Sequence, residues 1–284
     1  MKTRHLQTAS GRHAASFWGE DRGQDSGSLN ILALHGFTGS GLDFAPLAQR
    51  LPHPLLAPDL IGHGRSPAPT SVSAYRIEAA AEHCLAWCDS APEWVVMGYS
   101  MGGRVALRLA RLLGERLKGL VLIGASPGIE QAEDRRARAV QDDALAARIE
   151  TEGMAWFCDH WARHPVIQSQ QSIPPELRVP MQERRSRNRA AGLAGSLRGM
   201  GQGQVAPVWQ ELHTIGCPTL LLTGERDRKY AAIAARMAGL IPRSQHMEIP
   251  EAGHCAHLEA VDAATSVIDA WLGDLRATHP PPSR

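Results

Sequence analysis

The chain has 284 residues, of which 43% are hydrophobic and 21% are charged, and its formal net charge at pH 7 is +1. This composition is ordinary for a soluble globular enzyme, and the near-neutral charge argues against a general role in binding nucleic acid or a membrane surface. The length suits a single α/β domain with room for an inserted cap.

The N-terminal segment and the cysteines indicate where the protein works. Residues 1–20 contain no apolar signal core, and no segment approaches 18 consecutive apolar residues. The five cysteines, an odd number without the spacing of a disulfide framework, predict reduced thiols. We therefore expect a cytoplasmic protein without membrane insertion, and a monomer because no exposed apolar seam is evident.

Apolar runs, most of them ending in glycine or polar residues, predict buried strands. In chain order they are residues 29–36, 55–60, 94–100, 117–126, 217–227 and 244–254. Stretches with apolar residues at helical spacing lie at 102–117 and 231–240. Continuous apolar strands that alternate with amphipathic helices predict an α/β fold, with a mostly parallel central sheet and helices on both faces.

The strand pattern stops between residues 127 and 205. This stretch is helix-like and carries Trp156, Phe157 and Trp161 among charged residues, and the strand pattern resumes after it. We predict an α/β core from residues 1–126 and 206–276, a helical cap inserted at 127–205, and a flexible tail at 277–284.

The second half of the predicted cap is basic. Six arginines lie between Arg178 and Arg198, against the single acid Glu183. Two interpretations are open: a solvated charged face, or a roof that attracts an anionic substrate, since the planar guanidinium matches a carboxylate.

The pentapeptide from Gly98 to Gly102, GYSMG, has the form G-x-S-x-G and lies between a predicted strand and a predicted helix. In that context the pattern is typical of a sharp turn that lifts a nucleophilic serine, here Ser100, above the edge of the sheet. The alternative is a structural serine in a tight turn.

A serine hydroxyl needs a base to take its proton, and this kind of fold supplies Asp and His later in the chain. Asp227 ends one strand run and His254 ends the next. Asp227 would orient His254, which would shuttle the proton of Ser100. Asp59 and His257 are weaker candidates: we expect Asp59 to fix its loop and His257 to be a partly buried histidine.

Two further predictions concern bound charge and metal. The backbone N–H groups of Phe37, after His35-Gly36, and of Met101 are placed to form an oxyanion hole. His254, Cys255 and His257 lack a matching ligand pair elsewhere, so we expect no metal.

These motifs resemble a known family. His35-Gly36-Phe37, DLIGHGRS, GYSMGG, GERD and AGH are similar to the α/β-hydrolase superfamily over nearly the whole chain. More narrowly, GYSMGGR, SPGIEQAEDRRAR, WARHPV, ERRSRNRAAGL, GERDRKY and AGHCAH resemble the 2-succinyl-6-hydroxy-2,4-cyclohexadiene-1-carboxylate (SHCHC) synthase family of menaquinone biosynthesis.

The resemblance implies a cofactor-independent lyase. Such an enzyme eliminates pyruvate from 2-succinyl-5-enolpyruvyl-6-hydroxy-3-cyclohexene-1-carboxylate (SEPHCHC), which carries three carboxylates. Ser100, activated by His254, would take the proton α to a carbonyl, and the oxyanion hole would hold the enolate charge.

The resemblance also implies substrate contacts. These are Tyr99 and Arg104 beside the serine, and Arg138, Trp161 and Arg185 from the cap. Because RSRNR departs from the usual family pattern, Arg184 or Arg187 could replace Arg185, and Arg135 or Arg136 could replace Arg138.

Two other functions are open. One is a carboxylesterase, thioesterase or C–C bond hydrolase that acts on an anionic substrate. The other is a ligand receptor built on the same scaffold. In each case the expected partner is a small polycarboxylate and no nucleic acid.

Overall fold

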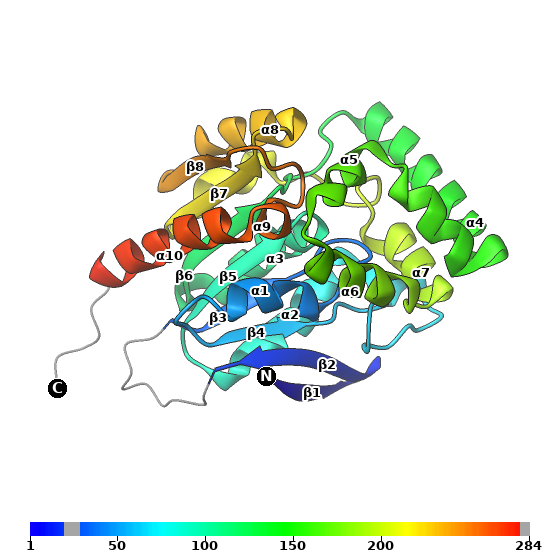
Figure 1. Cartoon of the computed structure of the whole chain (residues 1–284), viewed down its shortest axis with the longest axis horizontal. Helices are drawn as coiled ribbons and strands as arrows, with labels where there is room; N and C mark the ends of the chain where they lie inside the picture. Colours follow the sequence, from blue (N-terminus) through cyan, green and yellow to red (C-terminus); the bar gives the residue numbers. More distant parts are fainter. Residues whose placement is uncertain (20–28, 279–284) are drawn as a thin grey trace.

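The centre of the molecule is an eight-stranded sheet with the strand order β1-β2-β4-β3-β5-β6-β7-β8 (Figure 1). The computed structural model describes residues 1–19 and 29–278. The strands are β1 Lys2–Thr8, β2 Gly11–Trp18, β3 Ile31–Leu34, β4 Leu55–Pro58, β5 Trp94–Tyr99, β6 Leu117–Ile123, β7 Thr219–Gly224 and β8 Ser244–Ile249. The strands from β4 to β8 along the sheet pair in parallel, which confirms the predicted fold class.

Helices cover both faces of the sheet because the inner strands carry buried apolar residues on both faces. In β5, Val96 packs with helices on one face, while Val95 and Met97 pack with helices on the other. The first face carries α2 Ile77–Trp87, α3 Met101–Leu113 and α8 Arg228–Ala238, and the second carries α1 Ala45–Ala48, α9 Ala256–Glu259 and α10 Val261–Thr278.

The antiparallel hairpin of β1 and β2 was not predicted from the sequence. β1 pairs with β2 across a turn at Ala9 and Ser10. β2 begins at Gly11, whose φ of +118° favours glycine, and β2 then pairs with β4. β1 is an edge strand with the polar sequence KTRHLQT and no buried residue. It therefore lacks the apolar signal on which strand prediction depends.

The chain between β6 and β7 is helical and lies on one side of the sheet (Figure 1). Its helices are α4 Ala132–Ala162, α5 Pro165–Gln168, α6 Pro175–Ser186 and α7 Ala190–Met200, with 3-10 turns η6 Ser169–Ser172 and η7 Trp209–Thr214. α4 kinks at Gly153, whose φ of +80° and ψ of 180° are not helical. The cap boundaries at 127 and 205 stay a prediction.

The cap touches the core through backbone as well as side chains. A Cβ on Gly192 in α7 would lie 2.1 Å from the carbonyl oxygen of Gly62, which belongs to the DLIGHGRS loop. No side chain fits between these two segments. The glycines therefore set how closely α7 docks on the loop that follows β4.

The last helix reaches the start of the predicted tail. We predicted a flexible tail at 277–284, and α10 continues to Thr278, so the boundary of that tail stays a prediction. The restriction that Pro280 places on helical geometry falls on the residue before it, so Ala277 and Thr278 are free to extend the helix. The remainder of the predicted tail, 279–284, lies outside the described residues.

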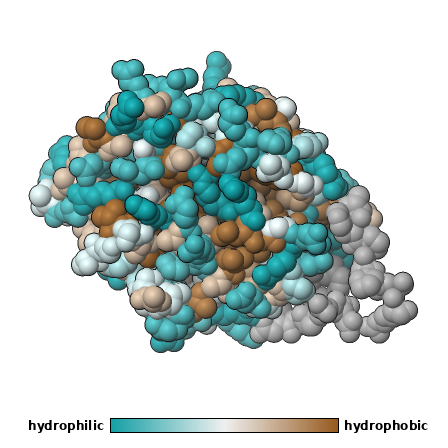
Figure 2. All heavy atoms as spheres, turned by 180° about the vertical axis from the view of Figure 1, so that it is seen from behind, coloured by the Kyte–Doolittle hydropathy of each residue, from teal (hydrophilic) through white to brown (hydrophobic). Residues whose placement is uncertain are grey.

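The surface and the helices carry two further observations. Seen from the side opposite to Figure 1, most of the surface is hydrophilic, with a group of apolar side chains near the middle (Figure 2). Within residues 1–19 and 29–278, no helix combines the length and the apolar character needed to cross a membrane.

Three buried histidines lie under the loops at the carboxyl edge of the sheet. His35, His63 and His257 are each at most 1% exposed. Burial, with a smaller contribution from neighbouring His35 and His254 respectively, lowers the pKa of His63 and of His257 to about 3. His257 packs against the rings of Tyr99 and Phe44, so the structure holds it as a neutral ring.

This burial predicts a loss of stability in acid. An unfolded histidine binds a proton below about pH 6.5, whereas folded His257 stays neutral down to about pH 3. The unfolded state therefore binds more protons in this window, and stability falls as the pH falls. Between pH 7 and pH 5 we expect His257 to account for about 2 kcal/mol of the loss in the free energy of unfolding.

Urea titrations at both pH values check this prediction. The variant His257→Gln should lose less stability than the wild type, and His5→Gln, at an exposed position, should match the wild type. An equal loss in the wild type and in His257→Gln would show that His257 is not held neutral.

Candidate active site

Ser100 lies in a strained turn between β5 and α3. Its φ of +49° and ψ of −107° are unusual for a residue with a side chain, and its N–H donates to the carbonyl of Ile123 at 2.9 Å. A Cβ on Gly98 would lie 2.6 Å from the Gly102 carbonyl oxygen, and one on Gly102 would lie 2.1 Å from the Leu34 oxygen. Both glycines of the pentapeptide are therefore required by close backbone contacts.

The structure brings Ser100, His254 and Asp227 into one hydrogen-bonded chain. His254 Nδ1 lies 2.6 Å from Asp227 Oδ2, and His254 Nε2 lies 3.0 Å from Ser100 Oγ. Because a carboxylate only accepts, Nδ1 carries the ring proton and Nε2 accepts from the serine hydroxyl. The three residues follow β5, β7 and β8, whose carboxyl ends meet at one edge of the sheet.

The two residues whose N–H groups are predicted to form an oxyanion hole both lie on segments that follow strands at this edge of the sheet. Met101 is the first residue of α3, and Phe37 lies in the loop after β3. Within the part of the chain that the structure describes, neither N–H forms a hydrogen bond with another backbone group. A Cβ on Gly36 would lie 2.7 Å from the Tyr99 ring, so the loop after β3 packs tightly beside the serine turn.

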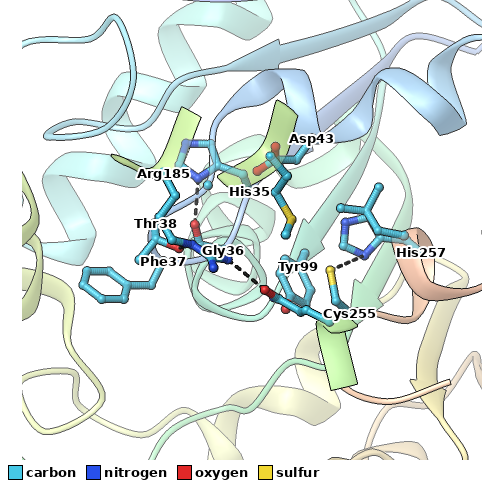
Figure 3. A pocket seen from close by; sticks show the side chains of 13 residues that line it. His35, Gly36, Phe37, Thr38, Asp43, Tyr99, Arg185, Cys255 and His257 are labelled. Carbon is cyan, nitrogen blue, oxygen red and sulfur yellow. Dashed lines mark hydrogen bonds between the residues drawn. The ribbon is translucent and has the colours of Figure 1, made fainter. Parts of the chain in front are cut away.

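A pocket opens beside Tyr99, between the loop after β3 and the cap (Figure 3). The Tyr99 ring lies between those of His254 and His257, with centroid distances of 5.4 and 4.6 Å, and burial raises its pKa. Arg185 reaches the pocket from α6, is only 7% exposed, and donates to Thr38 Oγ1 at 3.1 Å and Gln170 Oε1 at 2.8 Å.

Arg104 lies one helical turn after Ser100 and is also only 7% exposed. Its Nη2 donates to the carbonyl of Met200 at 3.1 Å, while its Nε is buried without a hydrogen-bond partner. Burial lowers its pKa to about 10, which leaves the guanidinium charged at neutral pH. Among the described residues, the one hydrogen bond from the side chain of this buried cation is to a neutral carbonyl.

Trp161 packs on both the cap and the loop after β3. Its ring stacks on Phe157 at 5.6 Å and meets the edge of Phe37 at 5.4 Å. Its Nε1 is buried and has no hydrogen-bond partner, so a donor is free beside Phe37.

The structure separates the candidate arginines of the cap. Arg185 faces the pocket, whereas Arg184 pairs with Asp43 at 2.7 Å and the Arg187 side chain is 77% exposed. Near the start of α4, Arg138 pairs with Asp142 at 2.7 Å and lies close enough to Arg104 to lower its pKa. Arg135 donates to backbone carbonyls and Arg136 is exposed.

The basic run from Arg178 to Arg198 is therefore not a uniform roof over the pocket. Four of its arginines form contacts that hold the fold: Arg178 with the Gln171 carbonyl, Arg184 with Asp43, Arg189 with the Ser66 carbonyl, and Arg198 with Asp143 and Glu150. Of the six, only Arg185 lines the pocket.

Asp59 and His257, the weaker catalytic candidates, form contacts that stabilise the fold. Asp59 accepts from the N–H of Gly41 at 2.8 Å and from Arg65, and hydrogen bonds and the charge of Arg65 lower its pKa against the opposing effect of burial. His257 is fully buried rather than partly buried, as described above. Among the described residues, no group of three or more His, Cys, Asp or Glu side chains could hold a metal ion.

Sequence reasoning missed four polar side chains of this region. Thr38 and Gln170 hold Arg185, Asn188 bridges the Thr38 carbonyl and the Gly64 N–H, and Glu259 binds the loop around His254. Thr38 has a φ of +71°. None of these residues belongs to a motif with a recognisable spacing, and the role of each comes from the groups that the fold places against it.

Comparisons with known proteins agree with this geometry. Residues 30–261 match a family model described as the alpha/beta hydrolase fold. A 2-succinyl-6-hydroxy-2,4-cyclohexadiene-1-carboxylate synthase of Klebsiella pneumoniae (strain 342) is 34% identical, over 84% of this chain and 90% of that protein. A Bacillus subtilis protein provisionally given the same name is 35% identical, over 85% and 89%.

A solved structure agrees as well. MenH from S. aureus superposes with a TM-score of 0.87 over 92% of this chain and 98% of that one, at 28% identity. The sequence matches, this superposition and the parallel sheet with its helical insertion support one conclusion. The chain belongs to the SHCHC synthase family of the α/β-hydrolase superfamily.

Proposed function

We propose that this protein is a cofactor-independent lyase that eliminates pyruvate from SEPHCHC to give SHCHC. Its relatives carry the name of that synthase. We infer that the substrate is anionic from two buried arginines, Arg104 and Arg185. Among the described residues, neither forms an ion pair with a carboxylate.

Unpaired buried charge is costly, so such a site is stabilised when an anion binds it. Other arginines of the cap show the contrast, because Arg138, Arg184 and Arg198 each have a carboxylate partner. Arg104 and Arg185 have only neutral partners. We infer that the carboxylates of the substrate complete these two sites, with Arg138 nearby as a third cation.

The proposed reaction starts at Ser100. Its hydroxyl lies 3.0 Å from Nε2 of His254, and Asp227 supports the positive charge that the ring acquires. The serine oxygen, activated in this way, takes the α-proton of the substrate. The electron pair left on the α-carbon then forms a double bond in the ring as the ring C–O bond to the enolpyruvyl group breaks, and the departing enolate takes the proton held by His254 and leaves as pyruvate.

The N–H groups of Phe37 and Met101 would stabilise the enolate charge that forms in this step. The N-terminus of α3 adds a favourable dipole at the same place. Tyr99 and Trp161 would form the walls against which the ring of the substrate packs, with the free Nε1 of Trp161 as a further donor. The arginines fix the substrate so that its α-carbon lies near Ser100.

The second candidate is a hydrolase that acts on an anionic ester or thioester. The contact between Ser100 and His254 favours it equally, because the same arrangement activates a serine for acyl transfer. Buried arginines without carboxylate partners disfavour neutral esters but do not separate a lyase from a hydrolase of anions.

The cellular compartment of the enzyme is also part of this proposal. All five cysteines are free, and Cys84 and Cys88 remain thiols although they lie four residues apart. This supports a reducing, cytoplasmic environment. The monomeric state stays a prediction.

Replacement of Ser100 tests the reaction. Ser100→Ala should abolish pyruvate release from SEPHCHC, a loss of on the order of 1000-fold or more in kcat, while the fold is retained. Pyruvate is measured with SEPHCHC made in situ by the preceding enzyme of the pathway. Short p-nitrophenyl esters are assayed in parallel, and rapid ester turnover without pyruvate release would replace the lyase by the hydrolase.

Replacement of the buried arginines tests the anionic substrate. Arg104→Gln and Arg185→Gln should each lower kcat/KM for SEPHCHC roughly 10- to 100-fold, as expected for a hydrogen bond to a charged group. Arg187→Gln is the matched control, because that side chain is 77% exposed and away from the pocket. Unchanged kcat/KM in both buried variants would remove the proposed clamp.

A further inference from the structure

We infer that Glu259 is a positioning residue for His254, and that Ser169 of the cap completes this contact and so links the cap to the reactive histidine. The inference rests on the proposed function only in taking His254 as the base of Ser100. It assigns a role to a carboxylate outside the Ser100–His254–Asp227 chain.

The loop that carries His254 is short and has little regular structure. It runs from the end of β8 at Ile249 to the start of α9 at Ala256. Within it, Glu251 has a φ of +57°, an uncommon conformation for a residue with a side chain. A loop of this kind needs contacts from other segments to hold one side chain within hydrogen-bond reach of Ser100.

One carboxylate supplies those contacts on both sides of the histidine. Glu259 Oε2 accepts from the N–H of Gly253 at 2.5 Å, and Glu259 Oε1 accepts from the N–H of Cys255 at 3.0 Å. These N–H groups belong to the residues immediately before and after His254. Hydrogen bonds from backbone N–H groups to an ionised acceptor are stronger than neutral ones, so Glu259 fixes the backbone from which the imidazole projects.

The cap reaches the same carboxylate. Ser169, in the 3-10 turn η6, donates its hydroxyl to Glu259 Oε1 at 2.8 Å. Its Cβ and Oγ also occupy the space beside Gly253, where an added Cβ would lie 2.3 and 2.4 Å from them. The loop of His254 is therefore held between Glu259 and a residue that belongs to the predicted cap.

The same turn holds the pocket arginine. Gln170, the residue after Ser169, accepts from Arg185 Nη2 at 2.8 Å. A substrate carboxylate that binds Arg185 thus acts on a segment that is one residue from the Glu259 contact. The hydrogen bond to the pocket arginine and the hydrogen bond to Glu259 are therefore made by two adjacent residues of η6.

A purely structural role for Glu259 makes a different prediction. Capping the short helix α9 would affect the stability of the fold and leave the reactivity of Ser100 unchanged. A positioning role changes the chemical step more than substrate affinity. The test therefore needs a measure of serine reactivity that does not depend on the identity of the substrate.

The experiment measures the rate at which a fluorescent fluorophosphonate labels Ser100 in the full chain, with Ser100→Ala as the blank. Glu259→Gln should label about tenfold more slowly, within the roughly 100-fold that a 1 Å misplacement of a reacting group costs. In the pyruvate assay its kcat should fall by a similar factor while KM changes less than about twofold. Ser169→Ala should slow labelling about threefold, since it removes one of three hydrogen bonds to the carboxylate.

Glu225→Gln is the matched control. Glu225 accepts from the N–H of Glu251 at 2.9 Å, so it holds the same loop three residues before His254. This variant should label at the wild-type rate. All rates are taken well below the melting temperature of each variant.

The outcomes separate the two proposals. Wild-type labelling rates in Glu259→Gln overturn the positioning role, even if its melting temperature falls. If that variant does not fold, Ser169→Ala decides: slower labelling supports the link and an unchanged rate overturns it. A wild type that labels at Ser100 but releases no pyruvate would contradict the proposed function and leave the labelling comparison intact, whereas a wild type that does not label overturns the inference.

Discussion

The close approach of the first turn of α3 to β3 and β5 is the constraint on which the site depends. The backbone of Gly102 lies against the Leu34 carbonyl, and that of Gly98 lies against Gly102, at distances that exclude any side chain. This contact forces Ser100 into its strained conformation and directs its hydroxyl toward His254. It also sets the N–H of Met101 and the guanidinium of Arg104 on the same turn of helix. One backbone contact thus fixes the positions of three groups: the Ser100 hydroxyl, the Met101 N–H proposed to stabilise the enolate, and the guanidinium of Arg104 proposed to bind a carboxylate.

Strain elsewhere in the molecule is concentrated around the same edge of the sheet. Among the described residues, the non-glycine residues with positive φ are Thr38, Ser100 and Glu251. They lie on the loops after β3, β5 and β8, and these are the loops that surround the hydroxyl of Ser100. Such conformations cost free energy and persist only where neighbouring contacts determine them. Glu259 supplies such contacts for the last loop on both sides of His254, and Asn188 and Arg185 supply them for the first.

Much of this arrangement could be predicted from the sequence, for identifiable reasons. The parallel strands are continuous apolar runs, and the serine turn has a fixed glycine spacing, so Ser100, Asp227 and His254 could be named in order. The hairpin strand β1 could not, because it is polar along its length. The ion pairs of the cap arginines could not be predicted either, because they depend on partners such as Asp43 and Glu150 that lie far away in the chain. Glu259 was missed although Gly253 and Cys255 are near it in the sequence, because its role comes from which N–H groups the fold turns toward its carboxylate.

The helical segment between β6 and β7 has a consequence for the history of this fold. β6 and β7 are neighbours in the sheet and pair in register from Leu120 with Thr219 to Ile123 with Leu222. The chain leaves the sheet at the end of β6 and returns at β7, which lies beside β6. The pairing of these two strands therefore depends little on the length and sequence of the helical segment between them. The helical segment over the pocket can therefore change in evolution while the strands that precede Ser100, Asp227 and His254 keep their alignment. New substrates become accessible by remodelling a segment that the sheet does not need for its own assembly.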